Sequence, residues 1–144
     1  MKRQQPKFDN FDTAAAKEID APEPIEQFAI LLVDDSAVSL RGMARMLRKN
    51  WDVDLATSSD DAIKMMAQTN YAVVVSDCDM PGHNGIWLLE QVRETSPGTI
   101  RVLTSAGLHE RFAPYLKSGL IHVFLHKPLV GESLSNMLIG LIMR

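Results

Sequence analysis

The sequence predicts an α/β fold: a five-stranded parallel sheet, doubly wound, with five helices on its two faces. From residue 27 onward, apolar segments of strand length alternate with amphipathic segments of helix length. That alternation is typical of βα units whose sheet is covered on both faces. Glycine and proline residues also stand at joints between these segments, where helices end and strands turn.

The five expected strands are short runs rich in branched apolar residues. They cover residues 28–33, 53–56, 72–76, 100–104 and 122–126. A stretch with helical periodicity follows each strand. These stretches cover residues 36–49, 59–68, 84–95, 109–117 and 132–144. Pro114 lies inside the fourth of them, and an interior proline removes a backbone hydrogen bond, so we expect that helix to begin late or to bend.

The segment in front of the first strand differs from the rest. Residues 1–26 are polar, contain three prolines and have no sustained apolar periodicity. We therefore predict a mobile extension at 1–26 and one globular domain at 27–144. The alternative is that Phe8 and Phe11 dock on this domain or on a partner.

Composition excludes several classes of function. The 144 residues include 15 Lys and Arg against 18 Asp and Glu, for a formal net charge of −3, so no broad positive field is available for nucleic acid. No apolar run approaches the roughly 20 residues that cross a bilayer, and none at the amino terminus has the form of a secretory signal. The single cysteine, Cys78, has no second cysteine to pair with. We expect a cytoplasmic protein without direct nucleic-acid or membrane binding.

Polar residues follow four of the five expected strands, where ligands bind in an open α/β sheet. They are Asp34 and Asp35 after the first strand, Asp77 after the third, Ser105 after the fourth and Lys127 after the fifth. With the strand order 2-1-3-4-5, the acidic pair and Asp77 lie on strands about 4.8 Å apart. The lysine side chain can span most of the roughly 10 Å to Asp77. We therefore predict one pocket that holds all five side chains.

That pocket has the chemistry of a magnesium and phosphoryl site. Crowded carboxylates repel one another unless a cation lies among them, and oxygen ligands without histidine or cysteine suit Mg²⁺. An aspartate can act as nucleophile toward phosphorus, while Mg²⁺ and Lys127 stabilise the transferring group and Ser105 hydrogen-bonds to it. The sequence contains neither a P-loop nor a G-x-G-x-x-G motif, so nucleotide binding has no support.

Four sequence blocks carry a family resemblance. They are LLVDDS (31–36), VVVSDCDMPGHNG (73–85), LTSAG (103–107) and FLHKPL (124–129). They resemble, in order and separation, the signature blocks of bacterial response-regulator receiver domains of the chemotaxis-regulator type, over 27–144. The resemblance implies a flavodoxin-like fold and a phosphorylation switch in a two-component phosphorelay, with a histidine kinase or phosphotransfer protein as the phosphodonor.

The resemblance also assigns roles to the acidic residues. The phosphoryl acceptor of the D-x-x-M-P pattern falls on Asp77 and not on Asp79. By the same matching, Asp35 is a direct Mg²⁺ ligand and Asp34 holds the ion mostly through water. The backbone carbonyl of Asp79 would complete the protein ligands.

The remaining blocks supply the switch. Ser105 matches the family's serine or threonine, Lys127 its lysine, and Phe124 the aromatic ring that moves inward as Ser105 closes on the phosphate. Chemistry would be limited to the protein's own phosphorylation and dephosphorylation, so we expect no enzyme. The sequence departs from the family in the loop MPGHNG, where His83 and Asn84 replace a methionine and an aspartate; Asn84 can still cap the helix that follows.

Two surfaces are candidates for partner binding. Arg41, Arg45 and Arg48 form one stripe of the first helix. In receivers this face meets the kinase or phosphotransfer partner, although a solvated face has the same pattern.

The last helix has no charge between residues 133 and 143, and we expect Ile139 and Met143 on the side away from the core. Its expected core stripe comprises Leu134, Met137, Leu138, Leu141 and Ile142. With the fourth helix and fifth strand it would contact an effector or a second copy of the chain.

Other functions remain as alternatives at this stage. One is a phosphorylation-independent adaptor with a receiver fold. Another is a regulatory fragment of a larger effector such as an HD-type phosphodiesterase, because the first and third strands also resemble receivers attached to such domains. Hydrolysis of external phosphate esters ranks last, since no substrate pocket is indicated. We expect Cys78 to serve in packing and His83 to be a solvated loop residue.

Overall fold

The computed structural model describes residues 27–129 and 131–143, with the backbone alone for 131–133. The expected extension at 1–26, including Phe8 and Phe11, lies outside the described residues. Within the described part of the chain, no helix combines the length and the apolar character that a bilayer crossing needs.

Five parallel strands form one sheet in the order β2-β1-β3-β4-β5, as the sequence predicted. The strands are β1 Phe28–Val33, β2 Trp51–Ala56, β3 Val73–Asp77, β4 Ile100–Ser105 and β5 Val123–His126. β2 begins earlier than expected, at Trp51, and β3 extends to Asp77. The candidate acceptor is therefore the last residue of a fully buried strand rather than a loop residue.

Helices connect the strands and begin at polar caps. They are α1 Ala37–Leu47, α2 Ser59–Met66, α3 Gly85–Thr95, the 3-10 helix η2 His109–Phe112, α4 Ala113–Lys117 and α5 Gly131–Ile142. The side chains of Ser36, Ser58 and Asn84 accept the hydrogen bonds that start α1, α2 and α3. The predicted cap at Asn84 is confirmed.

The fourth helical segment is divided at Phe112. A 3-10 turn covers His109–Phe112, and α4 begins only at Ala113. Pro114 is thus the second residue of α4, where its missing N–H has no helical partner to lose. The expectation of a late start is confirmed.

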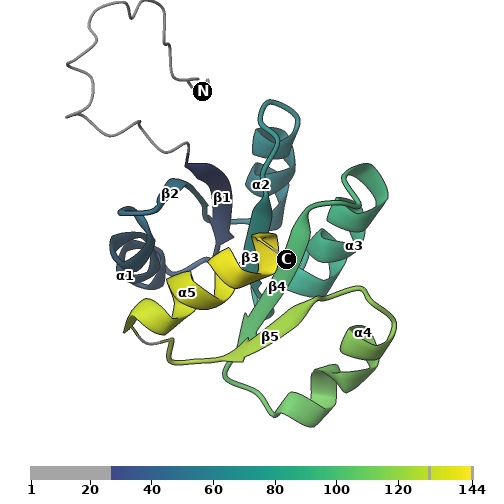
Figure 1. The fold of residues 1–144 in the computed structure, drawn as a ribbon. Coiled ribbons are helices and arrows are strands. Elements are labelled where there is room, and N and C mark those ends of the chain that lie inside the picture. Colours follow the sequence, from purple (N-terminus) through teal and green to yellow (C-terminus); the bar gives the residue numbers. More distant parts are fainter. Residues whose placement is uncertain (1–26, 130, 144) are drawn as a thin grey trace, which may run out of the picture.

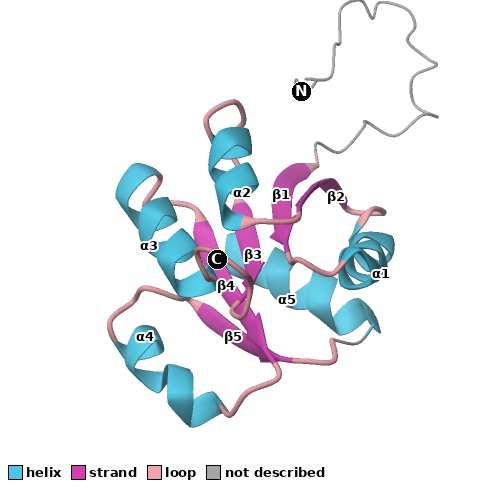
Figure 2. Cartoon of the chain, turned by 180° about the vertical axis from the view of Figure 1, so that it is seen from behind, coloured by secondary structure: helices cyan, strands magenta, loops and turns pink. Residues whose placement is uncertain are grey.

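The helices form two layers, one on each face of the sheet. α1 and α5 pack on one face, and α2, α3 and the η2–α4 segment pack on the other (Figures 1 and 2). On the first face the indole Nε1 of buried Trp51 donates to Oγ of Ser135, 3.3 Å away, and so joins β2 to α5. On the second face the ring of Trp87 packs against the core and stacks on His83, with centroids 3.7 Å apart.

The position of α5 corrects one sequence prediction. Ile139 is half-buried and packs against the core, so its placement on the outer side of the helix was wrong. α5 lies beside α1 as well as over the sheet, and two neighbours bury a wider arc of the helix than one does. Asn136, Gly140 and Met143 face the solvent instead, and Met143 is 69% exposed.

Arg101 is a buried cation at the amino-terminal end of the sheet. It stands in β4 and is 4% exposed. Its guanidinium donates at 2.7–3.2 Å to four carbonyl oxygens, those of Pro97, Thr99, Gly119 and Leu120. The backbone N–H of Arg101 donates to Nδ1 of His122, and the N–H of His122 donates to the carbonyl of Arg101. Burial, and then the charge of Arg93, lower the pKa of Arg101.

Candidate phosphoryl-acceptor site

Three carboxylates meet at the carboxyl ends of β1 and β3. β1 and β3 pair in parallel with Val33 opposite Ser76, which places Asp34 and Asp77 at the same level of the sheet. Carboxylate oxygens of Asp34, Asp35 and Asp77 all lie within 4.8 Å of one another. The first and third of these residues are buried and Asp35 is exposed.

The turn after β1 holds Asp34 in place. Its backbone N–H donates to the carbonyl of Ala56 in β2, and its Oδ1 accepts a 2.9 Å hydrogen bond from the N–H of Ser36. Because Ser36 also caps α1, the start of that helix and the orientation of the carboxylate are fixed together. The neighbouring Asp35 is left to face the open side of the cluster.

Lys127 joins the two buried carboxylates. Its Nζ lies 2.8 Å from Oδ2 of Asp34 and 3.1 Å from Oδ1 of Asp77. The backbone N–H of Lys127 donates to the carbonyl of Ser105, which extends the β4–β5 pairing by one residue, and a cis peptide bond leads from Lys127 to Pro128. The fifth strand therefore delivers the ammonium group directly between β1 and β3.

Among the described residues, the cluster has more carboxylates than positive charges, since Lys127 alone faces three acidic side chains. Burial raises the pKa of Asp77, the hydrogen bond and charge of Lys127 lower it, and the charges of Asp34 and Asp79 raise it, with a net increase. For Lys127, burial acts to lower the pKa, but its bonds to Asp34 and Asp77 outweigh burial, and the pKa is raised. The amine therefore stays protonated, while the ionised form of Asp77 lacks full compensation.

Ser105 and Thr104 are two buried hydroxyl residues at the end of β4. Oγ of Ser105 accepts from the N–H of Gly107, 2.9 Å away. Thr104 is opposite Asp77 in the sheet register, on the same face as that side chain. Its Oγ1 is buried without a hydrogen-bond partner among the described residues. The sequence did not single out Thr104, because a threonine in a strand has no signal beyond β propensity.

A tight turn between β3 and α3 packs against the backbone of Asp77. The N–H of Gly85 donates to the carbonyl of Cys78, and a Cβ at residue 85 would overlap the carbonyl oxygen of Asp77. Only glycine allows α3 to begin so close to the end of β3. Cys78 itself is 1% exposed, as expected for a packing residue.

Two expected site residues, Asp79 and Phe124, are not part of the three-carboxylate cluster. The side chain of Asp79 is 67% exposed and 3.6 Å from Nη2 of Arg111, a contact that the sequence analysis missed. An arginine in an amphipathic segment gives no signal of its own, because helix surfaces commonly carry such residues. The half-buried ring of Phe124 stacks on buried Phe112, with centroids 4.9 Å apart.

His83 does not belong to the carboxylate cluster. Its half-exposed ring stacks on Trp87, and its Nδ1 lies 3.2 Å from Oδ1 of Asp60. Oγ of Ser59 donates to the backbone carbonyl of His83. The histidine therefore links the loop before α3 to the start of α2.

The donor set fits Mg²⁺. It consists of carboxylate oxygens at the spacing of a single ion, with one exposed residue and two buried ones. Mg²⁺ prefers oxygen ligands and keeps several of its waters, so an open, exposed side is what it requires. Lys127 contacts Oδ2 of Asp34 and Oδ1 of Asp77, and Oδ1 of Asp34 accepts from Ser36, so Asp35 and Oδ2 of Asp77 remain for direct bonds to an ion.

Comparison with known proteins identifies the family. The family model of the response regulator receiver domain matches residues 30–139. The chain belongs to the response regulator receiver family. Receiver domains are regulatory phosphoacceptor switches of two-component systems, and they bind Mg²⁺ at an acidic pocket and interact with histidine kinases and effector domains. The alternative of a phosphorylation-independent adaptor is not favoured.

Relatives with this receiver domain have different outputs. The transcriptional regulatory protein ResD of Bacillus subtilis is 39% identical over 80 residues, which are 54% of this chain and 33% of ResD. A protein-glutamate methylesterase/protein-glutamine glutaminase of Geobacter sulfurreducens is 30% identical over 112 residues, 76% of this chain and 30% of that protein. The chain thus spans about a third of the length of these curated relatives.

Solved structures share the fold. The BeF3-activated DrrB receiver domain superposes with a TM-score of 0.74 at 22% identity, covering 82% of this chain and 99% of that one. The signal receiver domain of an HD domain-containing protein from Pseudomonas fluorescens Pf-5 gives 0.73 at 25% identity, covering 80% and 94%. TrrA from Thermotoga maritima, in complex with Mg²⁺ and BeF, gives 0.71 at 23% identity, covering 80% and 99%.

Proposed function

We propose that Asp77 of this receiver domain accepts the phosphoryl group, with Mg²⁺ held by Asp35 and Asp77 directly, by Asp34 mostly through water, and by the backbone carbonyl of Asp79. The observation that carries this proposal is the meeting of three carboxylates and one ammonium group at a single point above the sheet. Asp77 is the member of the cluster that Lys127 contacts at the end of the central strand β3.

The chain's own groups account for the transfer. A carboxylate oxygen of Asp77 attacks the phosphorus of the donor, and the bond from phosphorus to the donor's leaving atom breaks. Lys127 then turns its ammonium from the carboxylates to the phosphoryl oxygens, where it stabilises their charge. Bound Mg²⁺ supplies further charge neutralisation of those oxygens. Ser105 rotates from the N–H of Gly107 to donate its hydroxyl hydrogen to the product.

The switch that follows involves the β4–α4 side of the sheet. As Ser105 moves toward the phosphate, the space it leaves allows the ring of Phe124 to turn inward from its stack on Phe112. Phosphorylation shifts the population toward this state rather than forcing it. The chemistry stops there: the domain acts on its own acceptor and on no external substrate, in the cytoplasm expected from the sequence.

Phosphorylation with a small donor tests the assignment. Incubation with acetyl phosphate and Mg²⁺ should add one phosphoryl group, detected by mass spectrometry of the intact protein. Asp77→Asn should abolish the addition, and Asp79→Asn, a matched control two residues away, should retain it. A wild-type chain that stays unmodified, or an Asp77→Asn chain that is still modified, would show the assignment to be wrong.

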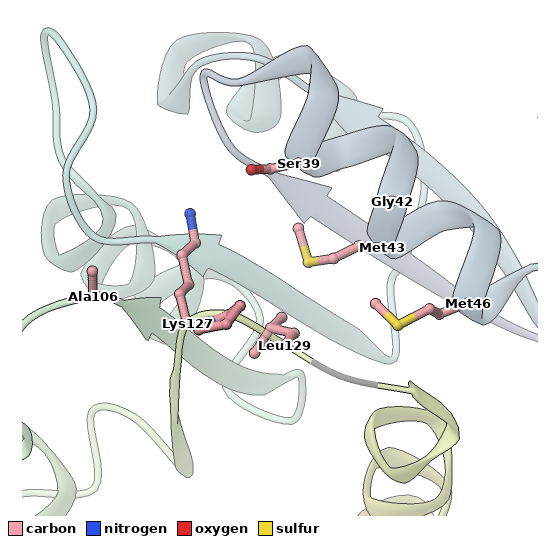
Figure 3. Close-up of a pocket in the computed structure, with 8 residues that line it drawn as sticks. Ser39, Gly42, Met43, Met46, Ala106, Lys127 and Leu129 are labelled. Carbon is pink, nitrogen blue, oxygen red and sulfur yellow. The ribbon is translucent and has the colours of Figure 1, made fainter.

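A groove beside the site is the proposed surface for the phosphodonor protein. It has a volume of about 440 Å³ and lies between α1 and the segment after β5 (Figure 3). Its lining consists of Ser39, Gly42, Met43, Met46, Ala106, Lys127, Pro128 and Leu129. Arg41 and Arg45 of α1 and Arg48 at its C-cap are exposed and add positive charge to the same helix. A helix seated in this groove would bring its own phosphohistidine next to Lys127 and hence to Asp77.

Charge reversal separates docking from chemistry. The double variant Arg41→Glu/Arg45→Glu should slow phosphotransfer from the cognate histidine kinase at least about 10-fold and leave phosphorylation by acetyl phosphate unchanged. Lys64→Glu on α2 is the control with a reversed charge away from the groove. Equal loss with both donors would locate the defect in the site rather than in docking.

The proposed output surface comprises α4, β5 and the exposed end of α5, and it binds an effector or a second copy of the chain. Met143 remains a candidate contact there because it is 69% exposed. In sedimentation, the Mg²⁺–beryllofluoride form should associate with itself or with the effector more strongly than the free protein does. Met143→Gln should weaken that association. Association unchanged by the substitution would remove Met143 from the surface.

A further inference from the structure

Arg111 contacts the segment that follows the acceptor residue, and the proposed chemistry does not use it. It belongs to η2, which follows β4, so it approaches β3 from the side opposite the acidic pair of β1. Its Nη2 is 3.6 Å from Oδ1 of Asp79 and 4.0 Å from Sγ of Cys78. These are the two residues that directly follow Asp77.

The space at Gly107 shows how near Arg111 comes to the hydroxyl of Ser105. A Cβ added to Gly107 would lie 3.2 Å from Oγ of Ser105 and 3.5 Å from Nη1 of Arg111. The hydroxyl and the guanidinium therefore border the same small volume, which stays open because residue 107 has no side chain. Since Ser105 binds the phosphoryl group in the proposed function, Arg111 stands beside the position of the phosphoryl oxygens.

The contact that holds Arg111 in the free protein is easily exchanged. In the Arg111–Asp79 pair the side chains are 55% and 67% exposed, and ion pairs this exposed contribute little. A phosphoryl group on Asp77 brings nearly two negative charges to the same neighbourhood. A guanidinium binds phosphate oxygens through two parallel hydrogen bonds, which is a stronger arrangement than one long contact with a solvated carboxylate.

We propose that Arg111 is a phosphoryl-binding residue, whose guanidinium leaves Asp79 when Asp77 is phosphorylated and hydrogen-bonds to the phosphoryl oxygens across from Lys127. The inference rests on the proposed acceptor role of Asp77. Movement of the Arg111 guanidinium would make the η2 segment respond directly to phosphorylation. Cζ of Arg111 lies 4.8 Å from the centre of the Phe112 ring, and that ring stacks on Phe124, so withdrawal of the guanidinium changes the surroundings of the expected switch residue.

Beryllofluoride, a phosphoryl mimic, tests the proposal by titration at saturating Mg²⁺, with bound fluoride followed by ¹⁹F NMR. Arg111→Ala should raise the dissociation constant about 3- to 10-fold, the loss expected for one charge-assisted contact. Arg111→Lys should lose less, because it keeps the charge without the planar fork. Lys117→Ala, which removes an exposed charge at the end of α4, should bind as the wild type does. Thermal unfolding without ligand checks that each variant is folded.

An Asp79→Asn background distinguishes binding from screening. If Arg111 contacts the phosphoryl group, Arg111→Ala weakens beryllofluoride binding in Asp79→Asn as it does in the wild type. If its effect disappears in that background, Arg111 only neutralises Asp79 and the proposal is overturned, as it is if Arg111→Ala binds with wild-type affinity. Failure of the underlying function has a different signature: the wild type itself binds no beryllofluoride, or Asp77→Asn binds it equally well.

Discussion

The two ends of the parallel sheet both bury charge, but they stabilise it in opposite ways. At the amino-terminal end, Arg101 alone is surrounded by four carbonyl groups that accept its hydrogen bonds. At the carboxyl-terminal end, the buried carboxylates of Asp34 and Asp77 share one lysine, and the hydroxyl of Thr104 has no partner within the described part of the chain. The first arrangement is complete without a ligand, whereas the second lacks positive charge.

The difference separates a structural role at the amino-terminal end of the sheet from a functional role at the carboxyl-terminal end. A buried charge is tolerated when hydrogen bonds replace its lost hydration. Arg101 meets that condition with backbone groups from the two connections that precede β4 and β5, so it holds those connections together. The buried carboxylates have only part of their lost hydration replaced, by one shared lysine. The missing positive charge makes the site receptive to a cation and a phosphoryl group.

The largest expected effect comes from breaking the amino-terminal end. Arg101→Met keeps much of the volume but leaves the buried carbonyls of Thr99 and Leu120 without their donor, so the free energy of unfolding should fall by about 3 kcal/mol. Urea denaturation measures this, with exposed Arg93→Met as the matched control, expected to cost well under about 1 kcal/mol. Equal losses in the two variants would mean that the carbonyl groups find water instead, and the contrast between the ends would be lost.

A pair of identical substitutions sharpens the comparison. Thr99→Val at the amino-terminal end removes a hydrogen bond to the carbonyl of Tyr71 and another to the hydroxyl of Ser96, each 2.8 Å long, and should lower the free energy of unfolding by about 1 to 2 kcal/mol. Thr104→Val at the other end removes a buried hydroxyl without a protein partner and should raise it by about 1 kcal/mol. Both values come from denaturant unfolding. Destabilisation by Thr104→Val would show that a bound water or a site residue uses that hydroxyl.

A smaller gain should follow from removing one carboxylate. In EDTA, Asp77→Asn should raise the free energy of unfolding slightly, because burial and the charges of Asp34 and Asp79 make ionised Asp77 unfavourable. Added Mg²⁺ should stabilise the wild type more than the variant and so reverse or erase the difference. A variant less stable than the wild type in EDTA would indicate that the bond to Lys127 outweighs the repulsion.

The smallest expected effect is on how the free energy of unfolding depends on pH, and its sign is opposite at the two ends of the sheet. Burial, and then the charge of Arg101, lower the pKa of His122 from its ordinary 6.5, so its contribution to stability is present above pH 6.5 and is lost as the pH falls below it. The pKa of Asp77 is raised from 3.8, so its contribution is present below that pH and is lost as the pH rises through the higher folded value. Denaturant unfolding in EDTA across this range should show the acid loss disappearing in His122→Gln and the acid gain disappearing in Asp77→Asn. The same slopes in variants and wild type would rule out these two groups as its source.

The carboxyl-terminal end was accessible to sequence reasoning because its logic is topological. Alternating apolar runs predict the parallel sheet, and with the strand order 2-1-3-4-5 the residues after neighbouring strands converge. Asp34, Asp77 and Lys127 could be brought together on that ground alone. The sequence could not show that the ammonium group bridges both carboxylates at 2.8 and 3.1 Å, because rotamers and the exact strand ends decide it.

Other features depended on neighbours that a sequence pattern does not contain. In the sequence, Arg101 is an ordinary polar residue in a strand. It is buried and donates to several carbonyls only because the turns at Pro97 and Gly119 approach it. Ile139 was assigned to solvent on the assumption of one packing face, but α5 also lies against α1. Arg111 reaches Asp79 from a segment whose 3-10 turn the helical pattern did not reveal.

The two tryptophans provide a built-in optical probe for each layer of the domain. Trp51 is sealed under α5 through its bond to Ser135, so its emission should shift to the red when that helix comes away from the sheet. Trp87 lies on the other layer and stacks on the ring of His83, so its emission should change when that stack is lost. Single replacement of either indole by phenylalanine would therefore allow the unfolding of one layer to be followed independently of the other.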